Sequence, residues 1–374
     1  MPFHGVSAMQ SKVEFVQLAL APGSNRRELC RRAGVSPTTA YKWIARYRAD
    51  GVAGLVERSR RPHCQPRRSN QVLETLVEAI WRENVGWGGR KIAHVLERDY
   101  GVGVAPSTVT AILRRSGVEL GQQGGGAQPF IRFEHPHPND LWQMDFKGHV
   151  ALRAGRLHPL TVLDDHSRYS VVLAACADEQ TATVRGHLIA AFQRYGLPWR
   201  IATDNGSPWG DGPGSPFTPL GVWLIEHGIQ ITHSRPYHPQ TLGKDERFHR
   251  TLKAEVMGST FQGLAEAQQA FDRWRERYNH YRPHQALDMQ TPSERFAPSP
   301  RTYKPEPEPF EYAPDDILRR VQQLGRFSFK GSIWKAPRAF YRKTIALRPT
   351  DKDGVYQLVF RTTTISTIDL NAKT

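Results

Sequence analysis

The stretch "LWQMDFKG" (residues 141–148) has the apolar and aromatic content of a β-strand, yet it carries an aspartate, Asp145, inside the strand. A carboxylate within a strand core is unfavourable unless it is paired or binds a metal ion. The stretch therefore indicates a functional site as well as a structural element.

The residues around this stretch alternate between strand and helix patterns over about 130–295. Two further strands follow in "HPLTVLDDHSRY" and "SVVLAACA", and later ones in "WRIATD" and "GIQITHS". Helical patterns cover about 179–195, 218–227, 241–257 and 263–280. Three consecutive strands followed by alternating helices and strands predict a mixed five-stranded sheet with helices on its faces, an α/β domain over 131–296.

Two more acids occur at the ends of elements in this domain. Asp204 follows the fourth strand in "ATDNGSP", where Asn-Gly also favours a simple turn. Glu246 lies near the start of a long helix in "HPQTLGKDERFHRTLK" (238–253). Together with Asp145 they form a set of hard oxygen ligands, which selects Mg²⁺, with Mn²⁺ as a substitute. We expect two ions for each active site.

The choice between the neighbouring acids Asp245 and Glu246 follows from helix geometry. At about 100° per residue, Asp245 falls near the middle of an apolar stripe, whereas Glu246 lies off it, on the side of Arg250 and Lys253. A metal ligand should face a groove lined with phosphate-binding cations, so Glu246 is predicted to be the catalytic acid. Asp245 is assigned to the helix N-terminus, where negative charge is favourable.

The first 120 residues are helical and basic. The segment "NRRELCRRAGVSPTTAYKWIARYRADG" suits two short helices joined at Gly34, with Ser36 as N-cap of the second helix and Pro37 at its first position. This pattern predicts a helix-turn-helix domain over 1–56, although a plain helical hairpin is the alternative. The residues expected to contact DNA are Thr38, Thr39, Lys42 and Arg46.

A second unit of the same kind is predicted over 71–120, from a helix at about 71–83, "GWGGRKIAHVLERDYG" and "APSTVTAILRRSG". Its expected DNA-contacting residues are Ser107, Thr108, Arg114 and Arg115. A basic linker, 57–70, joins the two units and would place Arg60, Arg61, Arg67 and Arg68 on a phosphate backbone or in a minor groove. A solvated linker is the alternative.

Two further linkers and a last domain complete the predicted organisation. Residues 121–130 are glycine-rich and predict a flexible tether, and 297–312 are proline-rich and predict an extended spacer. Residues 313–374 return to period-two alternation broken by Gly and Asp-Gly turns, which predicts a small all-β barrel.

Composition limits the classes of partner and compartment. The chain has 374 residues and a formal charge of +15, which favours a polyanion such as nucleic acid as its partner. Its three cysteines show no paired spacing, so neither a disulfide framework nor a zinc module is expected. No apolar run approaches the roughly 20 residues of a membrane span. We expect a soluble intracellular protein with no membrane partner and no organic cofactor.

The predicted α/β domain resembles the ribonuclease-H-like catalytic core of retroviral integrases and DDE insertion-sequence transposases. The matching stretches are "LWQMDFKG", "LDDHSRY", "TDNGSP", "SRPYHPQTLGKDERFHRTLKAE" and "YNHYRPHQAL". The resemblance implies that Asp145, Asp204 and Glu246 are the catalytic triad, that Lys253 contacts the element's end, and that Asn205 and Gly206 shape the loop after the second acid. The last two acids are 42 positions apart, more than the mid-thirties usual in the family, and the extra residues are expected in "WGDGPGSP".

The resemblance further implies a transposase of the bacterial cytoplasm, associated with the nucleoid, that binds terminal inverted repeats as a dimer or larger assembly. It would cleave double-stranded DNA at the element's 3′ ends and join them to target DNA. Two alternatives are a DNA-binding regulator with a decayed core and a nuclease indifferent to end sequence. Asp164 and Asp165 are expected in a turn rather than near the metals, Trp142 in the core, and "YNHYRPH" packed on the core, with DNA contact by Arg282 or His284 secondary.

Overall fold

The structure is a computed structural model that describes residues 8–57, 69–119, 134–153, 155–210, 216–233, 243–258 and 260–372. The chain divides into two compact units, residues 1–68 and 69–374. Four residues predicted to contact DNA lie outside the described ranges: Arg60, Arg61, Arg67 and Arg68.

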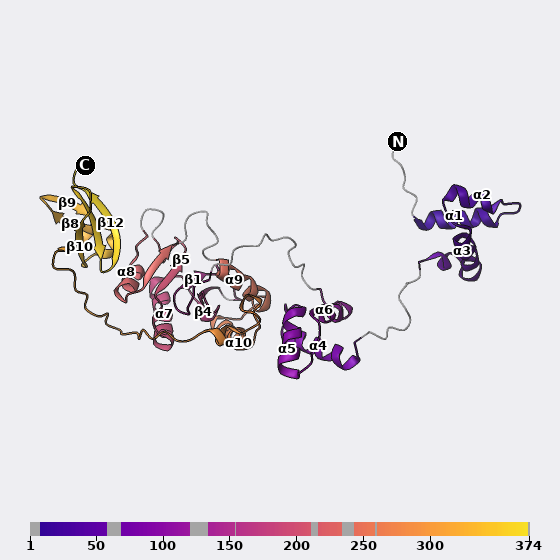
Figure 1. Cartoon of the computed structure of the whole chain (residues 1–374), viewed down its shortest axis with the longest axis horizontal. Helices are drawn as coiled ribbons and strands as arrows, with labels where there is room; N and C mark the ends of the chain where they lie inside the picture. The colour runs from indigo at the N-terminus through magenta and orange to yellow at the C-terminus, as the bar shows by residue number, and fades with distance from the viewer. Residues whose placement is uncertain are drawn as a thin grey trace. The chain divides into compact units, whose positions relative to one another are not determined.

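The first unit is a bundle of three helices (Figure 1), α1 (Ala8–Leu20), α2 (Arg26–Ala33) and α3 (Pro37–Asp50). Gly34 ends α2 in the left-handed conformation (φ 62°), and the Ser36 side chain accepts a hydrogen bond from the Thr39 backbone N–H at 3.2 Å. The predicted turn and N-cap are thus confirmed. A core that includes Val16, Ile44 and Leu55 holds the helices together.

The second helical domain begins the larger unit and contains α4 (Gln71–Glu83), α5 (Gly89–Tyr100) and α6 (Pro106–Arg115). Asn70 caps α4 by accepting the Leu73 N–H at 2.8 Å, and Pro106 occupies the first turn of α6. Its apolar faces meet in a separate core that includes Val77, Ile92 and Ile112.

The central sheet has six strands: β1 (Trp142–Phe146), β2 (Val150–Ala151), β3 (Arg156–Asp164), β4 (Ser170–Cys176), β5 (Arg200–Thr203) and β6 (Gln230–His233). The order is β2-β3-β1-β5-β6, and β4 pairs with β3. β1 and β4 run antiparallel to β3, whereas β1, β5 and β6 are mutually parallel. The mixed sheet is as predicted, with the two-residue β2 added to the five expected strands.

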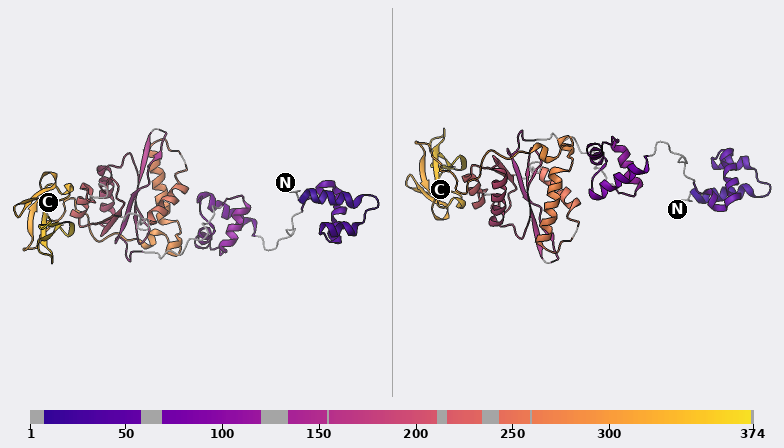
Figure 2. Two further views of the ribbon diagram at one scale, coloured as in Figure 1. Left: turned by 90° about the horizontal axis from the view of Figure 1, so that it is seen from above. Right: turned by 90° about the horizontal axis from the view of Figure 1, so that it is seen from below.

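Helices cover both faces of this sheet (Figure 2). On one face α7 (Thr181–Tyr195) and α8 (Pro219–Glu226) pack on Leu160 and Val162 of β3. On the other face α9 (Gly243–Glu255) and α10 (Leu264–His280) pack on Leu157 and Leu163 of the same strand. Because side chains alternate along a strand, this single strand supplies apolar residues to both cores. Trp142 is fully buried in the core beside α7, as expected.

The proline-rich segment after the α/β domain returns along its surface. The Ser299 N–H donates to the Tyr195 carbonyl at 2.7 Å, and the Leu197 N–H donates to the Arg301 carbonyl at 2.8 Å. His227 contacts the Lys304 carbonyl through Nε2 at 3.1 Å. This part of the predicted spacer is therefore attached to the end of α7 and to the residues beyond it.

The C-terminal region is all-β, and its described strands form two separate sheets. β7 (Ile317–Arg320), β10 (Thr344–Pro349), β11 (Val355–Phe360) and β12 (Thr363–Asp369) form a four-stranded sheet in the order β12-β11-β10-β7. β8 (Arg326–Phe329) and β9 (Ser332–Lys335) form a separate two-stranded sheet. Among the described strands no ladder closes one sheet on itself, because β7 and β12 are edge strands. Alternation along the sequence predicts strands, whereas closure depends on pairing between edges.

The C-terminal sheets share a hydrophobic core with α8. Val222 and Ile225 of that helix pack with Phe327, Phe340 and Leu358 of the C-terminal region. Thus α8 buries residues against both the central sheet and the C-terminal sheets. Among the described helices, none has the length and apolar character needed to cross a membrane.

Candidate active site

Asp145 and Asp204 lie at the carboxyl ends of two adjacent parallel strands. Trp142 pairs with Ile201 and Gln143 with Ala202, so continuing the register places Asp145 opposite Asp204. The charge of Asp204 acts on Asp145: burial first, and then Asp204, raise the pKa of Asp145 to about 7. Parallel pairing therefore brings together two acids that are 59 residues apart in the sequence.

The loop after Asp204 is shaped by the carboxylate itself. The Gly206 N–H donates to Asp204 Oδ1 at 3.0 Å. A Cβ at residue 206 would lie only 3.2 Å from Asp204 Oδ2, so glycine allows the close approach. The Asp204 carbonyl accepts a hydrogen bond from His233 Nδ1 at 2.9 Å, which ties the end of β5 to β6.

The two acids of α9 point in different directions. Asp245 is fully buried, whereas Glu246, the next residue in the same helical turn, is exposed. The Thr161 hydroxyl lies 3.1 and 3.2 Å from the two Asp245 carboxyl oxygens, and the Asp245 N–H donates to Gln143 Oε1 at 3.3 Å. Burial, followed by the charge of Asp145, raises the pKa of Asp245 well above its usual range. Asp245 thus joins α9 to β1 and β3.

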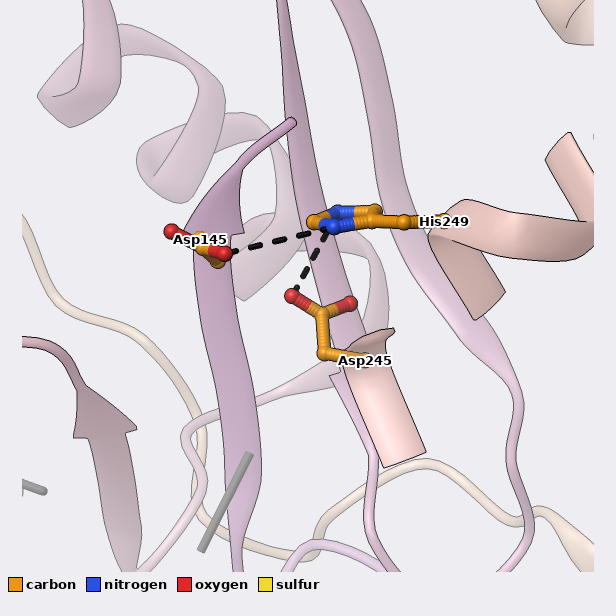
Figure 3. Close-up of side chains that lie close together, drawn as sticks. All are labelled: Asp145, Asp245 and His249. Carbon is orange, nitrogen blue, oxygen red and sulfur yellow. Dashed lines mark ion pairs between the residues drawn. The ribbon is translucent and has the colours of Figure 1, made fainter. Parts of the chain in front are cut away.

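His249 completes a buried cluster with Asp145 and Asp245 (Figure 3). Its Nδ1 lies 4.0 Å from Asp145 Oδ2, and its Nε2 lies 3.5 Å from Asp245 Oδ2. One potential ligand atom from each residue lies within 4.8 Å of the others. Burial lowers the pKa of His249 to about 3, so the ring is neutral at pH 7. His249 is not among the site residues predicted from the sequence, although its i+4 spacing from Asp245 places both residues on one helix face.

A second set of contacts fixes the start of α9 over the sheet. Lys244 Nζ lies 2.5 Å from Asp165 Oδ2, and Gln143 Nε2 donates to Asp165 Oδ1 at 2.8 Å. Gln143 also accepts the Asp245 N–H, so one β1 side chain contacts both Asp165 and α9. Asp164 accepts hydrogen bonds from the Ser167 N–H and hydroxyl. Both acids of "LDDHSRY" therefore have structural partners, and Asp164 has the predicted turn role.

The carboxylates at this edge of the sheet fit a hard divalent cation. Asp145 and Asp204 supply oxygen donors from adjacent strands, and α9 brings Asp245 beside Asp145. Glu246, the next residue of α9, is exposed and is not part of that cluster. Carboxylate oxygens are the ligands that Mg²⁺ and Mn²⁺ prefer. The pKa of Asp145 is raised, as expected for a carboxyl group that is partly buried beside another acid.

Family models match along most of the chain. Two models described as integrase core domain match residues 135–239 and 227–292. A helix-turn-helix domain model matches residues 11–63, and a homeodomain-like domain model matches 39–113. A model described as the C-terminal domain of IS481 family transposases matches residues 316–374.

The chain is a bacterial insertion-sequence transposase of the DDE, integrase type. It is accordingly an enzyme of the DDE polynucleotidyl transferase class, with DNA-binding helix-turn-helix domains, and its integrase-like core uses divalent metal.

Relatives of this transposase occur in other insertion elements. It is 26% identical over 288 residues to the uncharacterized 39.2 kDa protein of insertion element IS476 from Xanthomonas euvesicatoria, covering 76% of the transposase and 79% of the relative. It is 25% identical over 273 residues to the uncharacterized 31.7 kDa protein of IS407 from Burkholderia multivorans, covering 72% and 96%.

Solved structures with similarity to the transposase include two retroviral integrases. The HTLV-2 integrase catalytic core domain in complex with magnesium aligns with a TM-score of 0.34 and 16% identity, covering 43% of the transposase and 97% of that chain. A chain of the simian T-cell lymphotropic virus intasome in complex with a PP2A regulatory subunit aligns with a TM-score of 0.38 and 17% identity, covering 76% and 96%.

The predicted DNA-contacting residues of the transposase lie mostly on exposed helix positions. The exposed ones are Thr38, Lys42, Ser107, Arg114, Arg115, Arg250 and Lys253, and the partly buried ones are Thr39, Arg46 and Thr108. Two of them have partners within the protein: the Thr39 hydroxyl contacts Ser36 at 2.9 Å, and Arg115 pairs with Glu74 at 2.6 Å. Glu246, Arg250 and Lys253 follow one another at helical spacing along the exposed side of α9.

Proposed function

We propose that this transposase binds the terminal inverted repeats of its element, cleaves DNA at the 3′ ends, and joins those ends to target DNA. The observation that carries the proposal is the parallel pairing of β1 with β5, whose continued register sets Asp145 opposite Asp204, with Asp245 of α9 beside Asp145. The reaction would take place in the bacterial cytoplasm, on the nucleoid.

Asp145, Asp204 and Glu246 are the proposed metal ligands, for two Mg²⁺ ions that Mn²⁺ can replace. When bound, the ions would neutralise phosphate charge and lower the pKa of the attacking water or 3′-hydroxyl. Glu246 is chosen over Asp245 because Asp245 is fully buried and already contacts Thr161 and Gln143. The exposed carboxylate of Glu246 is available to a ligand that also contacts DNA.

The chain's own residues would orient the DNA around these acids. Arg250 and Lys253 share the exposed side of α9 with Glu246, so a phosphate backbone lying along α9 would pass the acid. A groove beyond the loop that follows β5 is lined by Ser207 together with Arg326, Lys335 and Arg338 of the C-terminal region. These cations suit contact with a sugar-phosphate backbone without sequence readout.

Binding and chemistry are tested together with duplexes that carry the element's own ends. Gel shift measures binding, and 3′ cleavage and strand transfer are measured with Mg²⁺, Mn²⁺ and Ca²⁺. We expect Glu246→Gln to bind end DNA like the wild type. Its rates of cleavage and strand transfer should fall by about 100-fold or more, which is the usual effect of removing a group that acts on the reacting atoms.

The matched variant is Asp245→Asn, one residue away on the same helix. Loss of chemistry in Asp245→Asn with wild-type activity in Glu246→Gln would make Asp245 the ligand and refute the proposed triad. Binding by the wild type without metal-dependent chemistry would identify a regulator. Cleavage indifferent to end sequence would identify a nuclease of the same fold. We further propose that a dimer or larger assembly holds both ends, which mass measurement of the protein–DNA complex checks.

A further inference from the structure

The last residue of the catalytic helix α9 takes part in a buried ion pair outside the active site. Arg282 NH2 lies 2.8 Å from Glu255 Oε1, and its Nε donates to the same oxygen at 3.2 Å. Each side chain is only 10% exposed. Trp274 Nε1 donates to the other carboxyl oxygen of Glu255 at 2.9 Å. Both oxygens of Glu255 are therefore engaged, by the segment that follows α10 and by α10 itself.

The residue before Arg282 belongs to a different core. The Tyr281 ring stacks on Trp87 of the second helical domain, with ring centroids 5.9 Å apart and planes inclined by 25°. Arg98 of α5 lies over the Tyr281 ring at 4.7 Å, and it donates a hydrogen bond to the Tyr281 carbonyl at 3.2 Å. Trp87 is only 2% exposed, so this contact is part of a packed interior.

Further contacts join the second helical domain to α9 and α10. Arg277 Nε donates to Asn84 Oδ1 at 2.9 Å. Gly86 has φ of 90°, and a Cβ placed on it would lie 3.7 Å from Glu255 Cγ. Lys91 of α5 is in the same cluster, since burial and then the charge of Arg282 lower its pKa to about 7. These residues and the ion pair all belong to the larger of the two compact units.

Consecutive residues thus contact the DNA-binding domain and the catalytic helix. Tyr281 is held by the second helical domain and Arg282 by the end of α9, and the Cα atoms of consecutive residues are only about 3.8 Å apart. The start of α9 carries Glu246, and α9 is continuous from Gly243 to Glu255. A helix transmits a displacement of one end to the other because its backbone hydrogen bonds hold it as a rigid rod.

We infer that Arg282 is a positioning residue that, through Glu255, sets the place of α9 relative to the second helical domain. DNA bound by that domain is then held at a fixed position relative to Glu246 at the start of α9. The inference rests on the proposed function, in which Glu246 is the third acid. It assigns Arg282 a role inside the protein rather than on DNA, in keeping with its 8% exposure.

The test compares Arg282→Met, Glu255→Gln and Arg282→Lys with a control, Arg273→Met, which alters an exposed arginine of α10. Affinity for end DNA is measured by gel shift, and the rate of 3′ cleavage is measured at saturating DNA with Mg²⁺. We expect the first two variants to keep wild-type affinity within about twofold while their cleavage rate falls by about tenfold or more, as a small misplacement of a catalytic group predicts. Arg282→Lys should recover part of the rate, and Arg273→Met should match the wild type.

Hydrogen exchange supplies a readout that does not depend on activity. In Arg282→Met the amides of α9 and of residues 84–91 should exchange faster, while those of β1 and β3 keep their protection. An unchanged cleavage rate, or an equal loss of affinity and rate, would overturn the inference. Absence of Mg²⁺-dependent cleavage in the wild type would overturn the proposed function instead. If the wild type shows no such cleavage, hydrogen exchange still tests the inference. Unchanged amide exchange in α9 of Arg282→Met would refute the coupling between Arg282 and α9.

Discussion

Replacing Asp145 by asparagine should stabilise the metal-free protein at neutral and alkaline pH. Burial and the charge of Asp204 raise the pKa of Asp145 from 3.8 to about 7. Between these two values the unfolded chain has lost a proton that the folded protein keeps. The free energy of unfolding therefore falls as the pH rises from about 4 to 7, and the loss is complete above pH 7.

The size of the effect follows from the same shift. About three pH units correspond to about 4 kcal/mol at most. The Asp145 side chain is 27% exposed, and solvent screening reduces this figure. We expect Asp145→Asn to exceed the wild type by about 2 to 3 kcal/mol at pH 8 and by much less at pH 4, since both carboxyl and amide are then neutral.

The assay is urea denaturation in EDTA at pH 4 and pH 8, followed by tryptophan fluorescence, because Trp142, Trp209 and Trp223 lie in the core of the α/β domain. Taking the difference between variant and wild type at each pH cancels the titration of groups remote from Asp145; Asp245, whose pKa the Asp145 charge raises, is not one of them. The control is Asp351→Asn, which changes an exposed acid in a turn of the C-terminal region.

Divalent metal should reverse the order of stability. Adding Mg²⁺ or Mn²⁺ at pH 8 should stabilise the wild type, because an ion that binds only the folded state shifts the equilibrium toward it. The same addition should have a much smaller effect on Asp145→Asn. If that variant has the same stability as the wild type at pH 8, or differs from it equally at both pH values, the electrostatic reasoning about this site is wrong.

Three further substitutions test contacts around α9. Asp165→Asn leaves the partly buried Lys244 ammonium without its carboxylate, which should cost about 3 kcal/mol in urea denaturation and lower the rate of 3′ cleavage. Thr161→Val removes the hydroxyl beside Asp245 while keeping the shape, so it should cost about 1 to 3 kcal/mol; Thr161→Ser should restore stability. Lys91 has a pKa of about 7 in the folded protein against 10.5 ordinarily, so wild-type stability should rise with pH between those values and Lys91→Met should abolish that slope, as measured at pH 7 and pH 9.

Local sequence patterns predicted the elements well. The turn at Gly34 with its cap at Ser36, and the helix at 71–83, agree with the structure because caps and apolar periodicity act over a few residues. The burial of Asp245 and the exposure of Glu246 also follow from helix periodicity alone. The division of the C-terminal strands into two sheets was not predicted, because it depends on which distant strand edges pair.

The sequence by itself therefore determined which segments are helices and strands, which family the chain belongs to, and which of two adjacent acids faces the core. Only the tertiary structure decided that His249 joins Asp145 and Asp245, that Asp165 holds the start of α9, and that Arg282 holds its end. The reason is physical: helix and strand periodicity are local properties of the chain. These contacts join residues that are distant in the sequence, Asp145 and His249 by 249 − 145 = 104 positions. Only the packing of the sheet and helices brings such residues together.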